Sequence, residues 1–405
     1  MEKQTYQSMN NSFKVNRRNF LKVSSAASAG LILGTPTLWA QDAQKQDKPE
    51  RPKTNLEDAL KVPKTKYSLP GAFPGKVVEI HNSGAMSEEK IDAEIVKQMF
   101  QSGIQKLTDQ NLKKSFKLFF KKDDIVGIKV NPVGPGLIST RLELVDAIID
   151  WLVENGIKKG NIIIWDRFDY MLTDAGFTTE RFPGIGIEGL QTMDETAAEG
   201  KAEDDSHWLK PDGTHVSAEN FDMDVYYWAD VEGPKDDKPY LNQHVFNGKY
   251  SYFGKLLTKK LTKIINVPVF KNTGNGISMA TKNLGYGAVC NTNRLHRPLF
   301  FDVCTEVLAF PVIRDKLALN ITDGLRAQYD GGPSQNANFA YIYNTQFFAT
   351  DPFALDMVCH NLMVQKRKEM NVNVNEHPRF TEYLRYAERL GLGIANPKKI
   401  SHIRA

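Results

Sequence analysis

The sequence predicts an α/β fold in which a mostly parallel, doubly wound sheet carries helices on both faces. Residues 124–166 contain an apolar run of strand length, a helical apolar pattern and a second apolar run in succession. Near-continuous apolar runs are typical of parallel strands that are buried on both faces. A further apolar run starts at Thr262, after a long polar insertion. Because crossover connections between parallel strands are right-handed, these units are expected to build one wound sheet.

Local residue patterns predict the first strand and the two helices that follow it. Residues 76–80 have the apolar character of a short strand. Ser87 is in position to cap the next helix, and Ile95 and Met99 lie on the apolar stripe of that helix. A second amphipathic helix is expected over about 109–120. Each of these two helices therefore has an apolar side to bury.

The unit 124–166 carries the clearest signals. Residues 124–130 form a strand, and the loop 131–136 is rigid because it contains two prolines and two glycines. Thr140 and Glu143 have the spacing of a capping box, so Thr140 is expected to cap the helix that follows. The second strand of the unit then covers 161–166.

The rest of the chain continues the pattern after an insertion at about 180–257, whose charged stretch is expected to be solvated. Asp351 and Pro352 have the residue types of an N-cap and a first helical position. The sequence predicts further elements in the order helix, strand, strand, helix and helix, at 300–310, 317–322, 346–349, 352–368 and 380–390.

The N-terminus has the form of a twin-arginine (Tat) signal peptide over residues 1–40. Arg17 and Arg18 are followed by Phe and Leu and then by a short, weakly apolar run, too short to span a bilayer stably. The alternative is an Arg-Arg pair that precedes an apolar stretch by chance. We expect the Tat export machinery as a partner, a periplasmic or exported location, and no stable membrane span after cleavage. A flexible linker is predicted over 41–72, followed by one α/β domain over 73–400.

The charge balance argues against nucleic acid as a partner. The full chain has a formal net charge of +4. Residues 1–40 hold five basic groups and one acidic group, so the remaining chain is formally neutral. No basic stripe is left to follow a phosphate backbone.

Three widely spaced cysteines set limits on metal chemistry. Cys290, Cys304 and Cys359 are too few for a four-cysteine iron–sulfur cluster or an all-cysteine zinc site. Three cysteines allow one disulfide at most, and buried free thiols are the favoured interpretation.

Charged side chains follow several of the predicted strands. Lys129 and Asn131 lie at the end of the first strand of the unit 124–166, and Asp166 and Arg167 at the end of the second. Ligands of open parallel sheets bind beyond the carboxyl ends of the strands. A lysine inside an apolar strand needs a partner or an anionic ligand, so Lys129 is either a catalytic group or a structural partner of Asp166.

The segment 262–287 is the strongest candidate for a ligand site, because an apolar strand leads directly into polar and glycine residues. Its backbone N–H groups and lysines could bind phosphate or carboxylate oxygens. It matches neither the P-loop nor the dinucleotide-binding motif. The alternative is a glycine-rich turn that packs on the sheet. The residues expected to bind a ligand or cofactor are Asn131, Lys271, Asn272, Gly274, Gly276, Lys282 and Asn283.

His296 and Asp323 complete the set of candidates. Together with Lys129 they are predicted catalytic residues, and both are candidate ligands of a divalent metal. The alternatives are a hydrogen-bonded structural histidine and a tight Asx turn. His207 and His215, in the polar insertion, are expected to face water. The cofactor prediction is either a divalent metal or a phosphate-bearing organic group.

Five blocks in this order give the chain a family resemblance. They are 126–131, 265–271, 281–285, 321–324 and 351–356, and together they resemble the domain of unknown function family 362. The resemblance extends over about 75–395. Relatives often have Lys-Thr-His after the central strand, where this chain has Lys271, Asn272 and Thr273. Ferredoxin-type cysteines, which some relatives carry, do not occur here.

Two functions are compatible with these observations. The first is an exported, cofactor- or metal-dependent enzyme of redox or isomerase type that acts on a small anionic substrate. The second is a non-catalytic protein that binds an anionic ligand or assists an exported redox partner. The sequence leaves open whether the protein is an enzyme.

Overall fold

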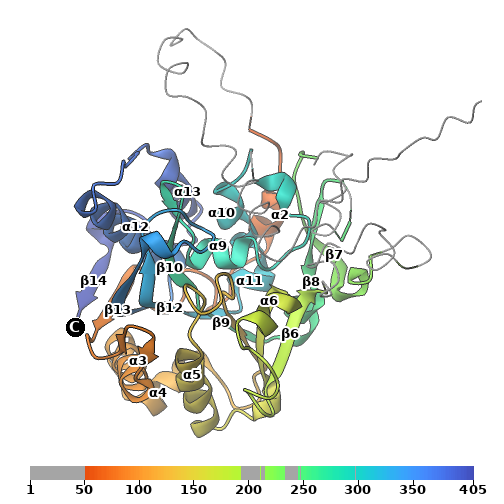
Figure 1. Cartoon of the computed structure of the whole chain (residues 1–405). Coiled ribbons are helices and arrows are strands. Elements are labelled where there is room, and N and C mark those ends of the chain that lie inside the picture. The colour runs from red at the N-terminus through yellow and green to blue at the C-terminus, as the bar shows by residue number, and fades with distance from the viewer. Residues whose placement is uncertain (1–50, 193–209, 211–214, 233–244, 247, 297) are drawn as a thin grey trace, which may run out of the picture.

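The computed structural model of the chain describes residues 51–192, 210, 215–232, 245–246, 248–296 and 298–405 (Figure 1). The predicted signal peptide, the linker up to residue 50, the charged stretch of the insertion and His207 lie outside the described residues. No helix within the described ranges is long and apolar enough to cross a membrane.

One sheet of ten strands organises the described part of the chain. Its main path runs in the order β14–β1–β13–β12–β9–β4–β5–β6. Off this path, β10 pairs with β12, and β11 pairs with β10. Neighbours are parallel except where β13 pairs with β1 and β12, and where β10 pairs with β11. The mostly parallel α/β prediction is confirmed. The strands are β1 (Lys76–His81), β4 (Val126–Lys129), β5 (Ile162–Phe168), β6 (Gly186–Gln191), β9 (Lys263–Asn266), β10 (Val269–Thr273), β11 (Gly276–Ile277), β12 (Leu317–Gln328), β13 (Ala340–Ala349) and β14 (Ser401–Arg404).

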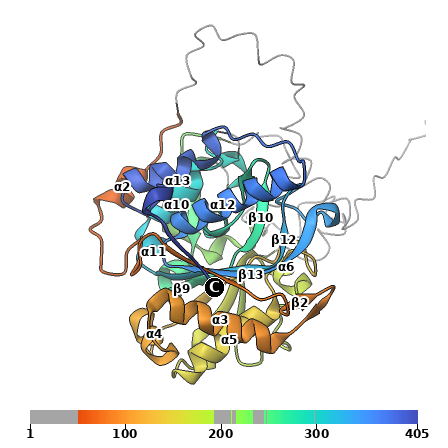
Figure 2. The same ribbon diagram turned by 90° about the vertical axis from the view of Figure 1, so that its left-hand side faces the viewer.

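Helices cover both faces of this sheet. On one face lie α3 (Ala93–Thr108), α4 (Leu112–Phe119) and α5 (Leu142–Glu154), as both views show (Figures 1 and 2). Their apolar sides form one core with strand residues such as Ile128. The opposite face carries α9 (Ala280–Gly285), α10 (Asp302–Ala309), α12 (Pro352–Glu369) and α13 (Arg379–Arg389). Three short helices complete the described set, namely α2 (Leu56–Lys61), α6 (Asp169–Asp174) and α11 (Pro311–Arg314).

The first predicted helix begins later than Ser87. That residue lies in a small hairpin of β2 (Met86–Ser87) and β3 (Lys90–Ile91). The cap is Asp92, whose carboxylate accepts hydrogen bonds from Glu94 N and Ile95 N, both at 3.1 Å. The Ser87 prediction is wrong because two residues of hairpin pairing precede the helix. Helix α4 has Asn111 as its cap and is shorter than predicted.

The predicted capping box at Thr140 is also wrong. The Thr140 hydroxyl accepts a hydrogen bond from Asn131 N (2.8 Å) and donates one to Val267 O (2.8 Å). The cap position is Arg141, whose backbone N–H donates to the Asp323 carboxylate (2.7 Å). A distant carboxylate thus replaces the local cap, and the threonine ties the β4–α5 loop to β9.

Strand β12 continues beyond its predicted end at 322. Asp323 therefore lies inside the strand, where it pairs in register with Gln346 of β13. The predicted helix at 352–368 is confirmed as α12, with the Asp351 carboxylate accepting from Phe353 N and Ala354 N. Strand β14 at the C-terminus has no counterpart in the predicted set.

The insertion contributes β6 to the main sheet and a separate hairpin of β7 (Phe221–Trp228) and β8 (Tyr250–Gly254). His215 is only 2% exposed, so the expectation that it faces water is wrong. Its Nδ1 accepts a hydrogen bond from Ser217 N (3.0 Å), and its burial lowers its pKa to about 4.

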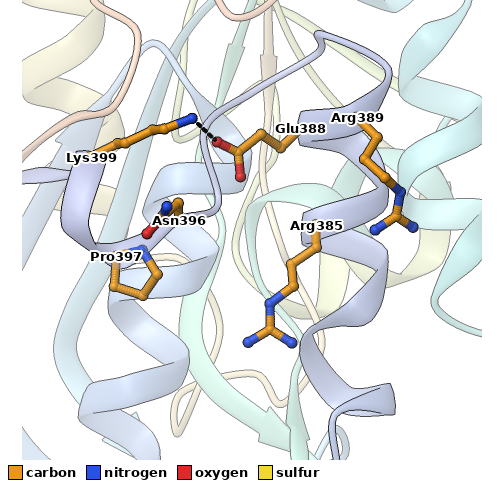
Figure 3. Close-up of a pocket in the computed structure, with 6 residues that line it drawn as sticks. All are labelled: Arg385, Glu388, Arg389, Asn396, Pro397 and Lys399. Atoms are coloured by element: carbon orange, nitrogen blue, oxygen red, sulfur yellow. Dashed lines mark hydrogen bonds and ion pairs between the residues drawn. The ribbon is translucent and has the colours of Figure 1, made fainter.

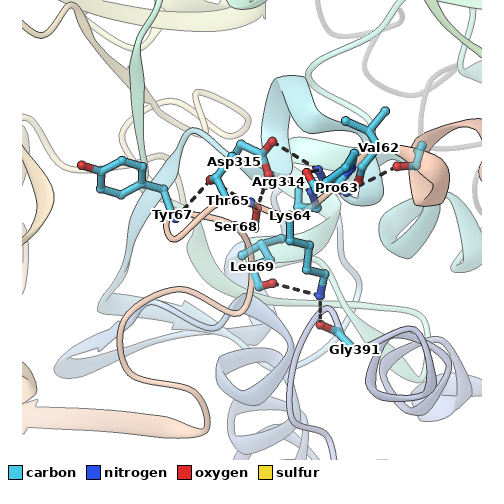
Figure 4. A network of polar contacts seen from close by, with 11 residues as sticks. Val62, Pro63, Lys64, Thr65, Tyr67, Ser68, Leu69, Arg314, Asp315 and Gly391 are labelled. Atoms are coloured by element: carbon cyan, nitrogen blue, oxygen red, sulfur yellow. Dashed lines mark hydrogen bonds and ion pairs between the residues drawn. The ribbon is translucent and has the colours of Figure 1, made fainter.

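Residues 51–72, predicted as part of a flexible linker, pack onto the body of the domain. The buried Arg314 guanidinium donates to the carbonyls of Val62 (3.1 Å) and Pro63 (3.1 Å) (Figure 4). Lys64 donates to Gly391 O in the same network. At the start of this segment, Arg51 pairs with Glu306, a carboxylate with no exposed surface. The linker prediction is wrong here because buried charges of the body need partners from this segment.

Candidate functional site

The candidate site lies at the carboxyl ends of the neighbouring strands β5, β4 and β9. In register, Lys129 of β4 pairs with Trp165 on one side and Asn266 on the other. Asp166 follows Trp165 directly. Charged side chains from separate segments thus meet at this edge of the sheet.

Lys129 forms a buried ion pair. Its side chain is 1% exposed, and its ammonium group donates to Asp166, to Val130 O (2.9 Å) and to Asn283 Oδ1 (3.1 Å). Burial lowers its pKa, and the Asp166 charge acts in the opposite direction. With three acceptors around it, including a carboxylate, the amine keeps its proton. Of the two interpretations given above, the structural pair with Asp166 fits this geometry.

A chain of amides connects the strand ends. Asn131 donates to Asn283 Oδ1 (3.2 Å), and Asn283 donates to Asn266 Oδ1 (2.8 Å). Asn266 in turn donates to Asn320 Oδ1 (2.9 Å) in β12. At the other end, Lys271 Nζ donates to Asn131 Oδ1 (2.8 Å). Because each amide both accepts and donates, the network fixes the orientation of Asn131 toward Lys271.

Lys271 differs from Lys129 in its partners. Its side chain is also 1% exposed, but its hydrogen-bond acceptor is the neutral amide of Asn131. Within the described part of the chain no carboxylate forms an ion pair with it. Burial lowers its pKa to about 7, and the positive charges of Lys282 and Lys129 add to this effect while Asp166 opposes it. The amine is therefore partly neutral near pH 7.

Lys282 brings a second cation close to Lys271. It lies on α9 with part of its side chain exposed, and its Nζ is 5.5 Å from the Tyr286 ring centroid and 5.4 Å from that of Phe300. No described carboxylate pairs with it, and burial lowers its pKa. The charge of Lys282 thus lies close enough to lower the pKa of Lys271, and two such lysines without described carboxylate partners favour an anionic ligand.

His296 lies beside Lys282 but carries no charge. Its ring packs on Tyr286, with 4.5 Å between the centroids, and its Nδ1 donates to Thr292 O (3.1 Å). Burial, aided by the nearby charges of Lys282 and Arg167, lowers its pKa to about 3. The neutral ring offers Nε2 as an acceptor and cannot serve as an acid near pH 7.

Asp323 has a structural role. It is 1% exposed, and its two oxygens accept from Arg141 N (2.7 Å) and Leu325 N (3.0 Å). Burial raises its pKa. The carboxylate holds the start of α5 and hence the loop that carries Asn131, so its predicted catalytic role is not supported. The described residues contain no group of three or more His, Cys, Asp or Glu side chains placed to hold a metal, and the metal role of Asp323 with His296 stays a prediction.

The Gly-Asn-Gly segment is the turn of the β10–β11 hairpin. Thr273 pairs with Gly276, and Gly274 has a φ of +53° in the turn between them. The Gly274 carbonyl accepts from Asn272 Nδ2 (2.9 Å) and Arg367 Nη1 (2.7 Å). Asn272, Gly274 and Gly276 therefore belong to a packing turn, as in the alternative interpretation, and their ligand role stays a prediction.

Two residues that position the site were not assigned to it from the sequence. The Asp356 carboxylate accepts from Ala280 N (2.9 Å) and Thr281 N (3.0 Å), which fixes the start of α9 and so places Lys282. At Gly287, an added Cβ would lie 2.3 Å from Asn283 O and 2.5 Å from Lys129 Cε, so this glycine leaves room for the α9 backbone and the buried lysine. A cap on another helix cannot be read from spacing, whereas the glycine was visible as part of the segment 262–287.

A cavity of about 460 Å³ lies elsewhere, between α13 and the turn at 397–399 (Figure 3). Its charged lining is mixed, and Lys399 pairs with Glu388 at 3.3 Å. Arg385 and Arg389 are exposed on the same side. This open surface cleft shares no residue with the amide network.

The comparisons with known proteins place the chain at family level. The family model described as "Domain of unknown function (DUF362)" matches residues 126–361. No curated protein matches the chain. Among solved structures, the crystal structure of a protein from Thermotoga maritima is similar at 8% identity, covering 69% of this chain and 60% of that chain, with a TM-score of 0.33. This chain thus spans less than two thirds of that protein.

Proposed function

The chain belongs to the DUF362 family, whose description names no activity, and we propose from its site that it is an enzyme acting on a small anionic molecule. The observation that carries this proposal is the pair Lys271 and Lys282, two lysines close together without a carboxylate partner among the described residues. A carboxylate or phosphate group between them would supply the missing negative charge. The ligand must be small, because Lys271 is almost completely buried.

Lys271 is the group we assign to proton transfer. A pKa of about 7 gives a substantial fraction of neutral amine at neutral pH, which suits a general base. The base would take a proton from the carbon next to the bound carboxylate, and Asn131 Oδ1 would stabilise the ammonium that forms. Proton transfer at carbon is the central step of many isomerases, so this chemistry favours the isomerase type.

A redox reaction would need a bound cofactor. Lys282 and Lys271 are suited to a phosphate-bearing organic group, since lysines bind phosphate as point charges. Such a group would supply the electron transfer, while the lysines would bind and orient it. A divalent metal is less well supported, because Asp323 already accepts two backbone hydrogen bonds.

We also propose that the protein is exported to the periplasm by the Tat machinery. The support is the Arg17-Arg18 pair, the residues that flank it and the short apolar run that follows. Changing both arginines to lysine should keep the precursor in the cytoplasm. Immunoblots of cell fractions test this, and a variant that is exported as efficiently as the wild type would disprove it.

Anion binding can be tested by calorimetric titration with phosphate and with small carboxylates. We expect Lys271→Met and Lys282→Met to lose binding, and the control Lys398→Met, at an exposed lysine, to keep it. Equal affinity in all four proteins would show that the site is elsewhere.

A non-catalytic function is the second candidate. The observation that favours it is the neutralisation of two predicted catalytic groups, since Lys129 is paired with Asp166 and His296 is uncharged near pH 7. Incubation with small carboxylates in D₂O separates the two functions. An enzyme of the proposed type would exchange the proton next to the carboxylate, which NMR detects, whereas a binding protein would be stabilised by the anion without exchange.

A further inference from the structure

We propose that Lys271 acts as a nucleophile and forms an imine with the carbonyl carbon of a small oxo acid. This inference rests on the proposed anion site, names the substrate class that the site would take, and for that class gives Lys271 a covalent role in place of the general-base role. The geometry that supports it is the contrast between two equally buried lysines at one edge of the sheet, Lys129 and Lys271.

The contrast lies in what each amine contacts. Lys129 donates to a carboxylate, a backbone carbonyl and an amide, so all three of its donors are used and its charge is balanced by Asp166. Lys271 donates to one neutral amide, Asn131 Oδ1, at 2.8 Å. A neutral amine needs only one such acceptor, and its lone pair then points away from Asn131. Desolvated lysines next to another cation are the ones that proteins use for imine chemistry.

Lys282 gives the reason for an oxo acid rather than a simple aldehyde or ketone. Its ammonium is close enough to lower the pKa of Lys271, and no described carboxylate neutralises it. A ligand with a carboxylate next to its carbonyl can therefore place its charge at Lys282 and its electrophilic carbon at Lys271.

The reaction balances without an oxidant or reductant. The Lys271 nitrogen lone pair forms a bond to the carbonyl carbon, and the C=O π electrons move to oxygen. That oxygen takes one of the two amine protons, which gives a carbinolamine. The hydroxyl group then leaves with the second amine proton as water, and a C=N double bond remains.

Reductive trapping tests the proposal. The full-length wild-type protein is incubated with pyruvate and sodium cyanoborohydride near pH 7.5, digested, and analysed by mass spectrometry. Hydride adds to the imine carbon and converts the imine into a stable secondary amine. We expect one pyruvate adduct per chain, on the peptide that contains Lys271, with Lys129 unmodified. Saturation of the yield with pyruvate would distinguish a binding site from surface chemistry.

Two variants sharpen the result. Lys271→Arg keeps a positive charge and should lose the adduct completely. Lys282→Met should lower the yield with pyruvate at least tenfold and lower the yield with the uncharged ketone acetone much less, because the loss of this charge also raises the pKa of Lys271. The control Lys398→Met should behave as the wild type.

Two outcomes would overturn the inference, namely no adduct in the wild type, or adducts spread over exposed lysines with Lys271 unmodified. If phosphate still binds in either case, the anion site stands and the imine alone is wrong. If neither phosphate binding nor an adduct is found, the proposed function fails as well.

Discussion

Replacing Lys271 with methionine gives a test that does not require the ligand. In the wild type, burial and the neighbouring lysines lower the pKa of this amine from 10.5 to about 7. Between these two pH values the amine is protonated in the unfolded chain and mostly neutral in the folded protein. Unfolding therefore takes up a proton, and the free energy of unfolding rises with pH. This group therefore destabilises the protein most below pH 7, and its penalty disappears as the pH rises toward 10.5.

The size of the effect follows from the same values. Within that window, the free energy of unfolding of the wild type should rise, through this group alone, by about 1.4 kcal/mol per pH unit. Between about pH 7.5 and about pH 9 the contribution is roughly 2 kcal/mol. The methionine variant lacks it. The variant also leaves Asn131 Oδ1 without its donor, which costs about 1–3 kcal/mol at every pH and so does not alter the slope.

Urea unfolding of the two proteins at several pH values, in buffer without phosphate or carboxylates, measures this difference. We expect the free energy of unfolding of the variant, relative to that of the wild type, to be higher at neutral pH than at pH 9. The exposed Lys398→Met variant should follow the wild type at every pH. Parallel curves for the Lys271→Met variant and the wild type would refute the assignment of a neutral amine at Lys271.

Three further predictions concern the residues that support the site. Asp323→Ala should lower the free energy of unfolding by about 3 kcal/mol, because two buried backbone N–H groups lose a charged acceptor; urea unfolding measures this, and an unchanged stability would contradict the anchoring role. Gly287→Ala should cost roughly 1–3 kcal/mol because its Cβ would overlap Lys129, whereas Gly160→Ala, where the new Cβ has open space, should be neutral in the same assay. Burial raises the pKa of Asp351 from 3.8 to about 7, so the wild type should lose stability as the pH rises through this window, when the folded protein must give up its extra proton. Asp351→Asn should not show this loss, and identical pH profiles of the two proteins would disprove it.

Much of the fold could be predicted because its signals are local. The apolar runs at 124–130 and 161–166 and the helical pattern between them depend on residues that are close in sequence, and the structure confirms them as β4, β5 and α5. The pairing of Lys129 with Asp166 was one of two interpretations that the sequence left open, and the structure shows the pair. A lysine flanked by apolar strand residues is informative because its burial requires a partner.

The errors arose where distant residues decide a local feature. Thr140 has the spacing of a cap, yet Asp323 performs that role from β12. Asp323 itself was placed at a strand end because Gly324 suggested a stop, but pairing with β13 carries the strand on to Gln328. Likewise, the sequence around Gly274 fits both a phosphate-binding segment and a packing turn. The turn became visible only through the pairing of β10 with β11.

The closing of the sheet edge has a consequence for biosynthesis. Strand β1 pairs in register with β14, so that Lys76 lies opposite Ser401, four residues before the last position in the chain. Arg51 must also reach Glu306, and Arg314 needs the carbonyls of the segment 59–63. Early residues thus wait for late ones to leave the ribosome before they gain their partners. The edge of the sheet at β1 can therefore be completed only once residues 401–404 have been synthesised.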